Sequence, residues 1–416
     1  MKKFLLTACA AAVLLLPQSA GAEGFAINEW SAEGVAMGGA RMFADNDPAN
    51  IAYNPASITK VKGEAFKQSA VYISPHGEFD MDVPGMGTVS GKNVVHAAWA
   101  PGGYYVKQLN DKDWFGIGMY SRFAMVSEFE RSQPVSSNAF FSKLNGISLT
   151  PVYAHKFDDK WSGAVGAEIN YAGLELQKNL YTEKFGIPGV TPTQTKGESY
   201  ALGWNAAVNY TFDAKNEVGV VYRSRIKHSM EADFDAYSPL GNISTDAYGC
   251  VTFPDSWTIG YNHKFNDRTR VELNAIRTNW STYDALNIYF AEPILGKIDS
   301  SKNPKNWKDG WRYAIGVEHK LSDKYTVMAG YAYDESSIPY EGGDFMVPTG
   351  RRKTYSIGAR YNDDKQALAL TLGWMDIGGL KIKGHGPDEG GTDAYSEART
   401  HDNYAKIFGI SYERHF

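Results

Sequence analysis

The sequence of 416 residues predicts an all-β protein, a transmembrane antiparallel β-barrel of about fourteen strands with an N-terminal plug in its lumen. Three observations predict this fold. The chain opens with an export segment, apolar residues alternate with small or polar ones along most of its length, and the chain closes on an amphipathic strand. We expect residues 1–22 to be a signal peptide, 23–62 the plug (hatch) and 63–416 the barrel.

The first 22 residues have the three parts of a secretory signal peptide. Lys2 and Lys3 give a positive start, residues 4–16 are apolar, and Ala20-Gly21-Ala22 supplies small residues for cleavage. The apolar run is too short for a membrane anchor, because a spanning helix needs roughly 20 apolar residues. We therefore expect cleavage after Ala22.

Composition narrows the class of the mature chain. Only Cys250 remains after cleavage, so an internal disulfide cannot form. The net charge of -5 is small, and no basic block points to nucleic acid. No apolar run reaches the length of a spanning helix, so the chain can be membrane-embedded only as a closed barrel, in which every backbone group pairs internally.

Apolar residues recur with period two from Glu64 onward, as in residues 325–334 and 367–374. A soluble β-sandwich would alternate in the same way, but the strands here are long and differ in their connections. Short polar turns lie at 158–160, 213–216, 266–267, 322–324 and 362–365, and longer polar connections lie near 181–198, 233–249, 285–306, 336–349 and 384–401. Short turns at one end and long loops at the other are typical of transmembrane barrels, with the short end in the periplasm.

The C-terminal strand gives the second sign of a barrel. Phe408, Ile410, Tyr412 and Phe416 share one face of an extended strand. This pattern resembles the closing strand of outer-membrane barrels, whose terminal Phe is read by the assembly machinery. We expect the protein in the outer membrane of a Gram-negative bacterium, as a monomer in contact with outer-membrane lipid and lipopolysaccharide.

A barrel of about fourteen strands leaves a lumen that its own wall side chains do not fill. Residues 23–62 lack the alternation, are rich in Gly and Ala, and carry turn signals at 46–48 and 54–55. A disordered tail is the alternative, but its usual composition is poor in the apolar residues present here, such as Trp30 and Phe43. We interpret this segment as the plug.

The plug residues resemble the long-chain fatty acid transporter family of outer-membrane proteins (FadL/TodX). The mature start reads Gly24-Phe25-Ala26-Ile27-Asn28-Glu29, and Gly34, Met37, Gly38, Asp45, Asp47 and Asn54-Pro55-Ala56 follow. Pro48 departs from the family, which often has Asp or Ala there. The resemblance implies capture of hydrophobic ligands at the outer face, an internal binding site, rearrangement of the plug, and sideways release through a gap in the wall.

The resemblance also implies roles for particular residues. Phe25, Asn28, Glu29, Asn54, Pro55 and Ala56 are the candidate gating residues. The wall gap of relatives lies at a kink of the third strand, which matches 121–129 here and centres on Phe123, Ala124 and Met125. Alanine at 124 replaces a common glycine and is less permissive, so we expect a milder or displaced kink.

Two lysines are candidates to bind a fatty acid carboxylate inside the barrel. Lys308 precedes the family's Asp-x-aromatic-Arg run at 309–312, and a looser match gives Lys178. Lysine can hold a carboxylate by a charge-assisted hydrogen bond. For either residue the alternative is a solvated charge at the rim.

Other functions are weighed against transport of hydrophobic compounds. A general diffusion porin would conduct ions and lack a plug. A membrane-embedded hydrolase is disfavoured because no G-x-S-x-G or H-E-x-x-H motif occurs. A secondary adhesin role of the outer loops is left open, as is the cargo, because relatives move fatty acids, aromatic hydrocarbons or other apolar compounds. We expect no cofactor, metal or catalytic residue.

Overall fold

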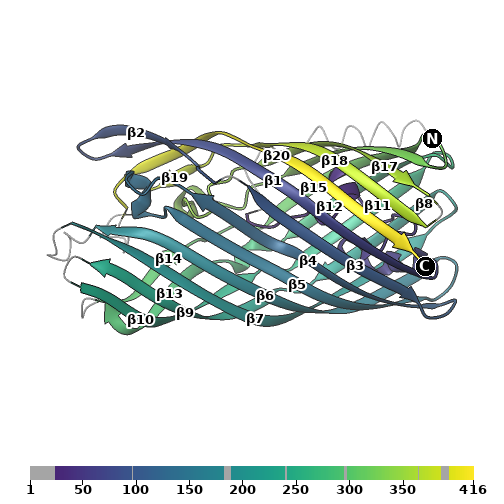
Figure 1. Ribbon diagram of the computed structural model, residues 1–416, viewed down its shortest axis with the longest axis horizontal. Coiled ribbons are helices and arrows are strands. Elements are labelled where there is room, and N and C mark those ends of the chain that lie inside the picture. The colour runs from purple at the N-terminus through teal and green to yellow at the C-terminus, as the bar shows by residue number, and fades with distance from the viewer. Residues whose placement is uncertain are drawn as a thin grey trace.

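The computed structural model describes residues 24–95, 97–181, 189–238, 241–294, 298–363, 365–385 and 393–416. The expected signal peptide and its cleavage site lie outside these residues. A single sheet closes into an elongated barrel (Figure 1). Among the residues described, no helix is both long enough and apolar enough to cross a membrane.

Twenty strand segments and several short helices make up the described chain. The strands are β1 (Glu64–Val83), β2 (Gly87–Lys92), β3 (Ala98–Gln108), β4 (Asp113–Glu128), β5 (Phe141–Lys156), β6 (Trp161–Tyr181), β7 (Val190–Thr211), β8 (Asn216–Arg223), β9 (Ile226–Ser238), β10 (Gly241–Phe253), β11 (Ser256–Lys264), β12 (Thr269–Thr278), β13 (Ala285–Ile294), β14 (Ile298–Pro304), β15 (Gly310–Lys320), β16 (Tyr325–Asp334), β17 (Arg352–Asn362), β18 (Gln366–Ile377), β19 (Lys381–Lys383) and β20 (Glu397–His415). The helices are α2 (Ala32–Ala36), α3 (Asn50–Tyr53), η1 (Pro55–Lys60), η2 (Pro134–Ser137), η4 (Trp280–Thr282) and η5 (Tyr340–Gly342).

These segments form fourteen antiparallel wall strands, which confirms the predicted fold. Six pairs of segments each continue one wall strand across an irregularity, namely β2 with β3, β8 with β9, β10 with β11, β12 with β13, β14 with β15, and β18 with β19. For example, β7 pairs with both β8 and β9. Pairing of β1 with β20 closes the barrel.

The period-two pattern places one face of each strand inside and the other outside. On β5, Leu144 and Val152 are buried, whereas Ile147, Leu149 and Tyr153 are exposed on the outer surface. The outer surface of the other strands is likewise apolar and rich in aromatic rings. Such an outward apolar surface suits lipid contact.

Several long connections differ from the sequence prediction. Strand hairpins that extend the wall beyond its apolar band occupy most of 181–198 and of 233–249 and parts of 285–306. The far ends of β10, β13 and β14 show this extension (Figure 1). Strand pairing continues there because it satisfies backbone hydrogen bonds whether the side chains are polar or not. The connection 336–349 was expected to be an exposed loop, but it folds inward and buries Phe345 completely.

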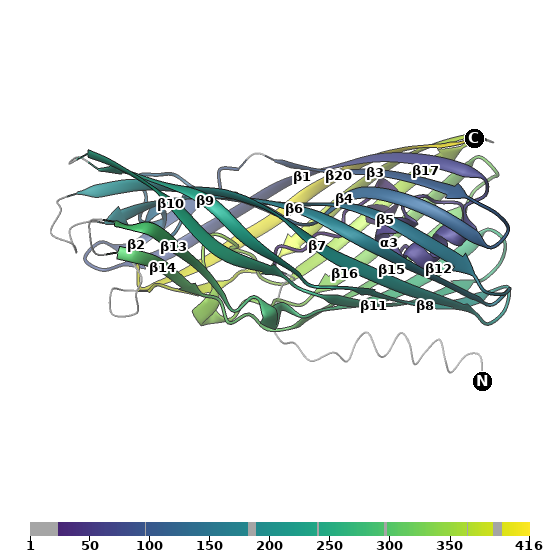
Figure 2. The ribbon, with the colours of Figure 1, turned by 90° about the horizontal axis from the view of Figure 1, so that it is seen from below.

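The plug segment, here residues 24–61, lies inside the barrel. It forms hydrogen bonds with β3, β4, β7, β8, β12, β15, β17, β18 and β20, which surround it on all sides. Figure 2 shows α3 inside the barrel, enclosed by the wall strands, toward the end where the C-terminus lies. The short turns at 213–216 and 322–324 close the same end, which is the predicted periplasmic one.

Candidate functional site

Phe25 lies at the centre of a cluster of aromatic rings, which we call the aromatic chamber. Its side chain is 3% exposed, and five ring centroids lie 4.7–6.0 Å from its own. These rings belong to Phe123, Phe253, Trp280, Tyr283 and Trp307. Most meet edge to face, the arrangement that aromatic quadrupoles favour. The chamber is an apolar surface contributed by both the plug segment and the wall.

Backbone pairing with β4 fixes Phe25 in this position. Ala26 forms a β-bridge with Phe123, the Ala124 amide donates to the Phe25 carbonyl (3.0 Å), and the Ile27 amide donates to the carbonyl of Arg122 (2.9 Å). The first described residues thus add a short strand to the inner side of β4. Gly24 precedes them at φ 52°, where a side chain would also collide with the rings of Trp280 and Trp307.

The wall itself is interrupted at this level, and we call the interruption the wall gap. The β3–β4 ladder runs from Gln108↔Trp114 only as far as Gly103↔Met119. Beyond Met119, β4 continues to pair with β5, and contact with the preceding wall strand resumes where the Val94 amide donates to the Glu128 carbonyl (2.8 Å). Between these points the described residues of β4 form no ladder with β3.

The irregularity of β4 lies slightly before the predicted kink. Its register against β5 shifts between Ser121 and Phe123, and three consecutive side chains, 121–123, are buried there. Ala124 follows the shift and does not adopt a positive φ, so glycine is not required at this position. The milder or displaced kink expected at Phe123, Ala124 and Met125 stays a prediction, and their role in release is taken up below.

A hollow of about 80 Å³ lies beside the wall gap. Apolar and polar residues line it in similar number. Met125 and Val126 of β4, Phe129 just after β4 and Phe79 of β1 are apolar, and the polar residues include His76, Glu78, Asn93 and Asn403. The inward-folded connection between β16 and β17 contributes Pro348 and Thr349. The hollow places an apolar surface next to the break in the wall.

A second cavity of about 40 Å³, the central cavity, lies between the plug segment and the wall. The plug contributes Ala26, Ile27, Asn28, Trp30, Gly39, Met42 and Tyr53, and the wall contributes Arg122, Phe123, Arg223, Ser256, Thr258, Asn274, Ile276 and Thr278. Sequence reasoning missed the two arginines. An inward-facing charge on a strand carries no signal of its own in the sequence.

The other predicted gating residues lie at two levels. Asn28 lines the central cavity, and the neighbouring Glu29 is buried, its carboxylate accepting from the Asn28 amide (2.9 Å). Asn54 ends α3 and begins η1, where its Oδ1 accepts from the Ala56 amide (3.2 Å). Its Nδ2 donates to Asn209 of β7 (2.6 Å), so the Asn-Pro-Ala turn is fixed to the wall.

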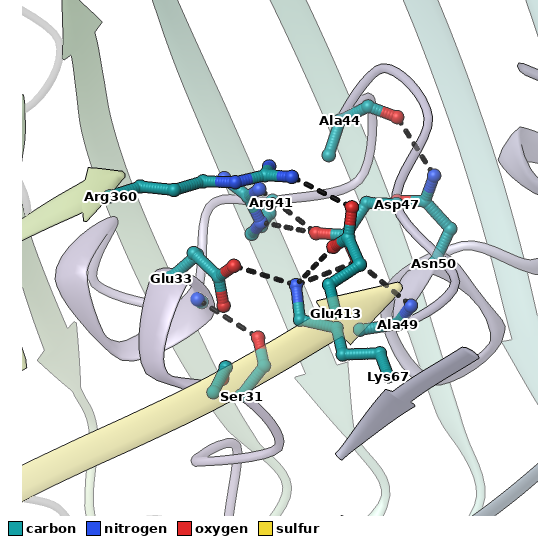
Figure 3. Close-up of polar contacts among 12 residues, drawn as sticks. Ser31, Glu33, Arg41, Ala44, Asp47, Ala49, Asn50, Lys67, Arg360 and Glu413 are labelled. Carbon is teal, nitrogen blue, oxygen red and sulfur yellow. Dashed lines mark hydrogen bonds and ion pairs between the residues drawn. The ribbon is translucent and has the colours of Figure 1, made fainter. Parts of the chain in front are cut away.

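A buried charge network joins the plug segment to the wall (Figure 3). Lys67 of β1 is fully buried, and its Nζ lies 2.8 Å from Glu33, 2.9 Å from Asp47 and 3.2 Å from Glu413 of β20. Arg41 pairs with Asp47 at 2.9 Å, and Arg360 of β17 pairs with Glu413 at 2.7 Å. Of these groups only Asp47 stood out in the sequence, because inward-facing charges give no signal until the closed wall brings them together.

The two predicted carboxylate ligands are placed differently. Lys308 has an exposed side chain, which does not fit the interior position expected for it, and the buried amine nearby is Lys305, which pairs with Asp344. Lys178 is partly buried near the outer end of β6. Phe416 is exposed at the C-terminus, and its amide donates to the Glu64 carbonyl.

Comparison with known proteins accounts for this architecture. The sequence profile of the family described as "Outer membrane protein transport protein (OMPP1/FadL/TodX)" matches residues 13–416. A curated relative, the long-chain fatty acid transport protein of Escherichia coli O6:H1, is 26% identical, with 91% of this chain and 92% of the relative covered.

Solved structures share the fold. A Pseudomonas aeruginosa FadL homologue superimposes with a TM-score of 0.84 at 19% identity, over 94% of this chain and 99% of the homologue. The Pseudomonas putida toluene transporter TodX gives a TM-score of 0.72 at 16% identity, over 93% of this chain and 98% of the transporter. The chain therefore belongs to the OMPP1/FadL/TodX family of outer-membrane transport proteins, which are not enzymes, and resides in the outer membrane of a Gram-negative bacterium.

Proposed function

We propose that this protein carries long-chain fatty acids or similar apolar compounds across the outer membrane and releases them sideways through the wall gap. The observation that carries the proposal is the interrupted β3–β4 ladder, with the plug segment bonded to β4 on its inner side. A ligand inside the barrel would meet the membrane interior there once Phe25 and its neighbours withdraw. In this scheme Phe123, Ala124 and Met125 border the exit.

The apolar surfaces of the interior support a path to that exit. The hollow beside the gap and the aromatic chamber both present rings and aliphatic side chains. Burial of each methylene of a ligand contributes roughly 0.8 kcal/mol, so a long chain binds tightly with few polar contacts. Release then requires a second state of lower affinity, which a moving plug segment supplies by a shift of populations.

Two parts of the plug differ in how firmly they are held. Residues 24–28 depend on a few backbone bonds, on hydrogen bonds from Arg352 and on ring packing, whereas Asn54-Pro55-Ala56 is capped internally and bonded to β7. We therefore assign movement to the first part and a fixed turn to the second. Lys178, near the outer end of the lumen, is a candidate contact for an arriving carboxylate.

The names of relatives bracket the cargo. One curated relative is a fatty acid transport protein, and one solved neighbour is a toluene transporter. A diffusion porin is the alternative function, and it predicts steady ion conductance in planar bilayers. The bonds of the plug segment to wall strands on every side argue against an open pore. We further propose cleavage after Ala22, a monomer, and assembly directed by Phe416.

Uptake by cells that lack their own fatty acid transporter tests the proposal. Ala26 and Phe123 form a bridge, so a cysteine at each position lies near disulfide geometry, and Cys250 is first changed to Ser. Oxidation of this double variant is expected to stop entry of labelled oleate or toluene, and a reductant is expected to restore it. Cysteines at the exposed cross-strand pair Asp80 and Ser90 serve as the matched control.

The proposal fails if the oxidised double-cysteine variant at positions 26 and 123 transports both compounds as fast as its reduced form does. It also fails if the untreated protein transports neither compound above cells that carry no transporter. Large, unblocked conductance in a planar bilayer would instead favour the porin.

A further inference from the structure

We infer that Arg223 links binding of a ligand carboxylate in the central cavity to release of α3, so that this transporter responds to anionic amphiphiles and not to neutral ones. The inference rests on the proposed function and adds to it a class of cargo and a coupling residue. It starts from an arginine that is buried, lines a cavity and holds the plug segment.

The contacts of Arg223 join three parts of the molecule. The residue ends β8 and is 3% exposed. Its Nη1 donates to the hydroxyl of Tyr120 on β4 (2.9 Å), and its Nη2 donates to the carbonyls of Ile51 (3.3 Å) and Ala52 in α3. The guanidinium also lies 5.8 Å from the ring of Trp30. The Arg223 side chain therefore holds the last turn of α3 against the wall by hydrogen bonds.

Every acceptor that Arg223 has in the described chain is uncharged. No carboxylate there lies within 4.0 Å of its guanidinium, whereas its neighbour in the cavity, Arg122, pairs with Glu168 at 2.9 Å. Buried charges in proteins are normally paired, because neutral dipoles do not fully replace hydration. The central cavity thus presents a cation that is held but not neutralised.

A carboxylate is the group that best fits this cation. Guanidinium and carboxylate form two parallel, charge-assisted hydrogen bonds that are stronger than bonds to neutral carbonyls. A ligand carboxylate that takes Nη1 and Nη2 would displace the hydroxyl of Tyr120 and the carbonyls of Ile51 and Ala52. A neutral alcohol offers no such advantage and would leave those bonds in place.

Loss of these bonds acts on the segment that precedes the fixed turn. The freed carbonyls belong to α3, which ends at Tyr53, one residue before Asn54-Pro55-Ala56. The same helix packs beside Trp30, which lines the cavity. Anion binding would therefore loosen α3 and, through Trp30, the path to Phe25. A ligand that binds the held and the loosened states of α3 equally well would not shift the balance between them.

Equilibrium binding of two probes with the same tail tests the inference. The full chain in lipid nanodiscs is titrated with oleate and with oleyl alcohol, and empty discs correct for partition into lipid. For Arg223→Gln we expect oleate affinity to fall about tenfold or more, with oleyl alcohol unchanged within about twofold. Arg223→Lys keeps the charge without the paired donors and should fall between them.

Arg352→Gln is the matched control. Arg352 also donates to plug carbonyls, those of Gly24 and Ala26, but it does not line the central cavity. Its loss should leave the ratio of oleate to oleyl alcohol affinity unchanged. Hydrogen exchange gives a second readout on the unmodified protein, where oleate and not oleyl alcohol should speed exchange in α3, residues 50–53.

The outcomes separate the inference from the proposed function. Equal effects of Arg223→Gln on both probes, or no effect on either, would overturn the inference and leave transport standing. Failure of the unmodified protein to bind either probe would count against both. If Arg223→Gln does not fold, the exchange experiment decides, and identical exchange with the two probes overturns the inference.

Discussion

Replacement of Lys67 by Met is expected to detach the base of the plug segment without opening the wall. The ammonium of Lys67 lies within 3.2 Å of three buried carboxylates, those of Glu33, Asp47 and Glu413. Asp47 and Glu413 keep an arginine partner each after the change. Glu33 keeps none among the described residues, so one carboxylate is left buried and unpaired.

The expected size of the effect follows from that unpaired charge. Removal of one partner of a buried ion pair typically costs about 3–5 kcal/mol. At 1.4 kcal/mol per tenfold change, opening of the plug segment should become roughly 10²- to 4 × 10³-fold more frequent. The wall should be spared, because its β-ladders run between neighbouring strands and do not depend on the plug.

Hydrogen exchange followed by mass spectrometry measures this difference segment by segment. Exchange of residues 31–50 should accelerate in the Lys67→Met protein, and exchange of β5 and β6 should not. Lys107→Met is the control, because Lys107 pairs with Glu64 at 3.6 Å on an exposed surface, where such pairs contribute about 0–1 kcal/mol. Glu33→Gln in the Lys67→Met background should recover part of the protection.

Two results would refute the reasoning. Equal exchange of residues 31–50 in the Lys67→Met and Lys107→Met proteins would mean that the charge network does not hold the plug segment. Parallel acceleration in the plug segment and the wall would mean that the two unfold as one unit.

Three further changes probe other parts of the plug. Phe25→Ala leaves a space among five rings and should cost about 3–5 kcal/mol locally, seen as faster exchange at residues 24–28; unchanged exchange would contradict the central place of this ring. Gly38→Ala should destabilise the plug, because Gly38 has φ 63° and a Cβ would lie 2.9 Å from the β16 backbone; Gly85→Ala (φ 82°, open space) should cost about 1 kcal/mol, and equal melting temperatures would contradict the argument. Asn54→Ala removes a cap and a bond to β7 and should reduce whole-cell uptake of hydrophobic compounds, whereas unchanged uptake of every compound tested would remove support for a gating plug.

The wall was predictable because its pattern is local. Period-two alternation and turn residues report the direction of each side chain and the ends of each strand without knowledge of the rest of the chain. The inward connection between β16 and β17 was missed for a related reason. Asp344-Phe345-Met346-Val347 carries an apolar run, but its polar flanks indicated a loop, and only the closed barrel offers the interior that buries Phe345.

The site was less predictable, because its groups come from distant parts of the sequence. Phe25 was expected at the gate from the family resemblance, yet its ring partners at 253, 280 and 307 carry no pattern that links them to it. Arg122 and Arg223 were missed, and Lys308 was expected inside but is exposed. A shared motif locates a residue along the chain reliably. It does not fix the direction of a side chain near a strand end, because a register shift of one residue moves that side chain to the other face of the strand.

The way in which the plug is held determines which part can move. The base of the plug is the part that Lys67 holds through Glu33 and Asp47. Its removal would leave buried ions unpaired, at several kcal/mol each, so expulsion of the whole plug is unfavourable. Its tip, residues 24–28, is held by two backbone hydrogen bonds to β4, by two hydrogen bonds from Arg352 and by the packing of one ring, and each hydrogen bond contributes about 1 kcal/mol net. We therefore expect withdrawal of residues 24–28 to cost less than removal of the whole plug. Arg223 binds α3 and contacts Trp30. In the inferred scheme, a ligand at Arg223 acts on the tip through Trp30 while the charged base stays in place.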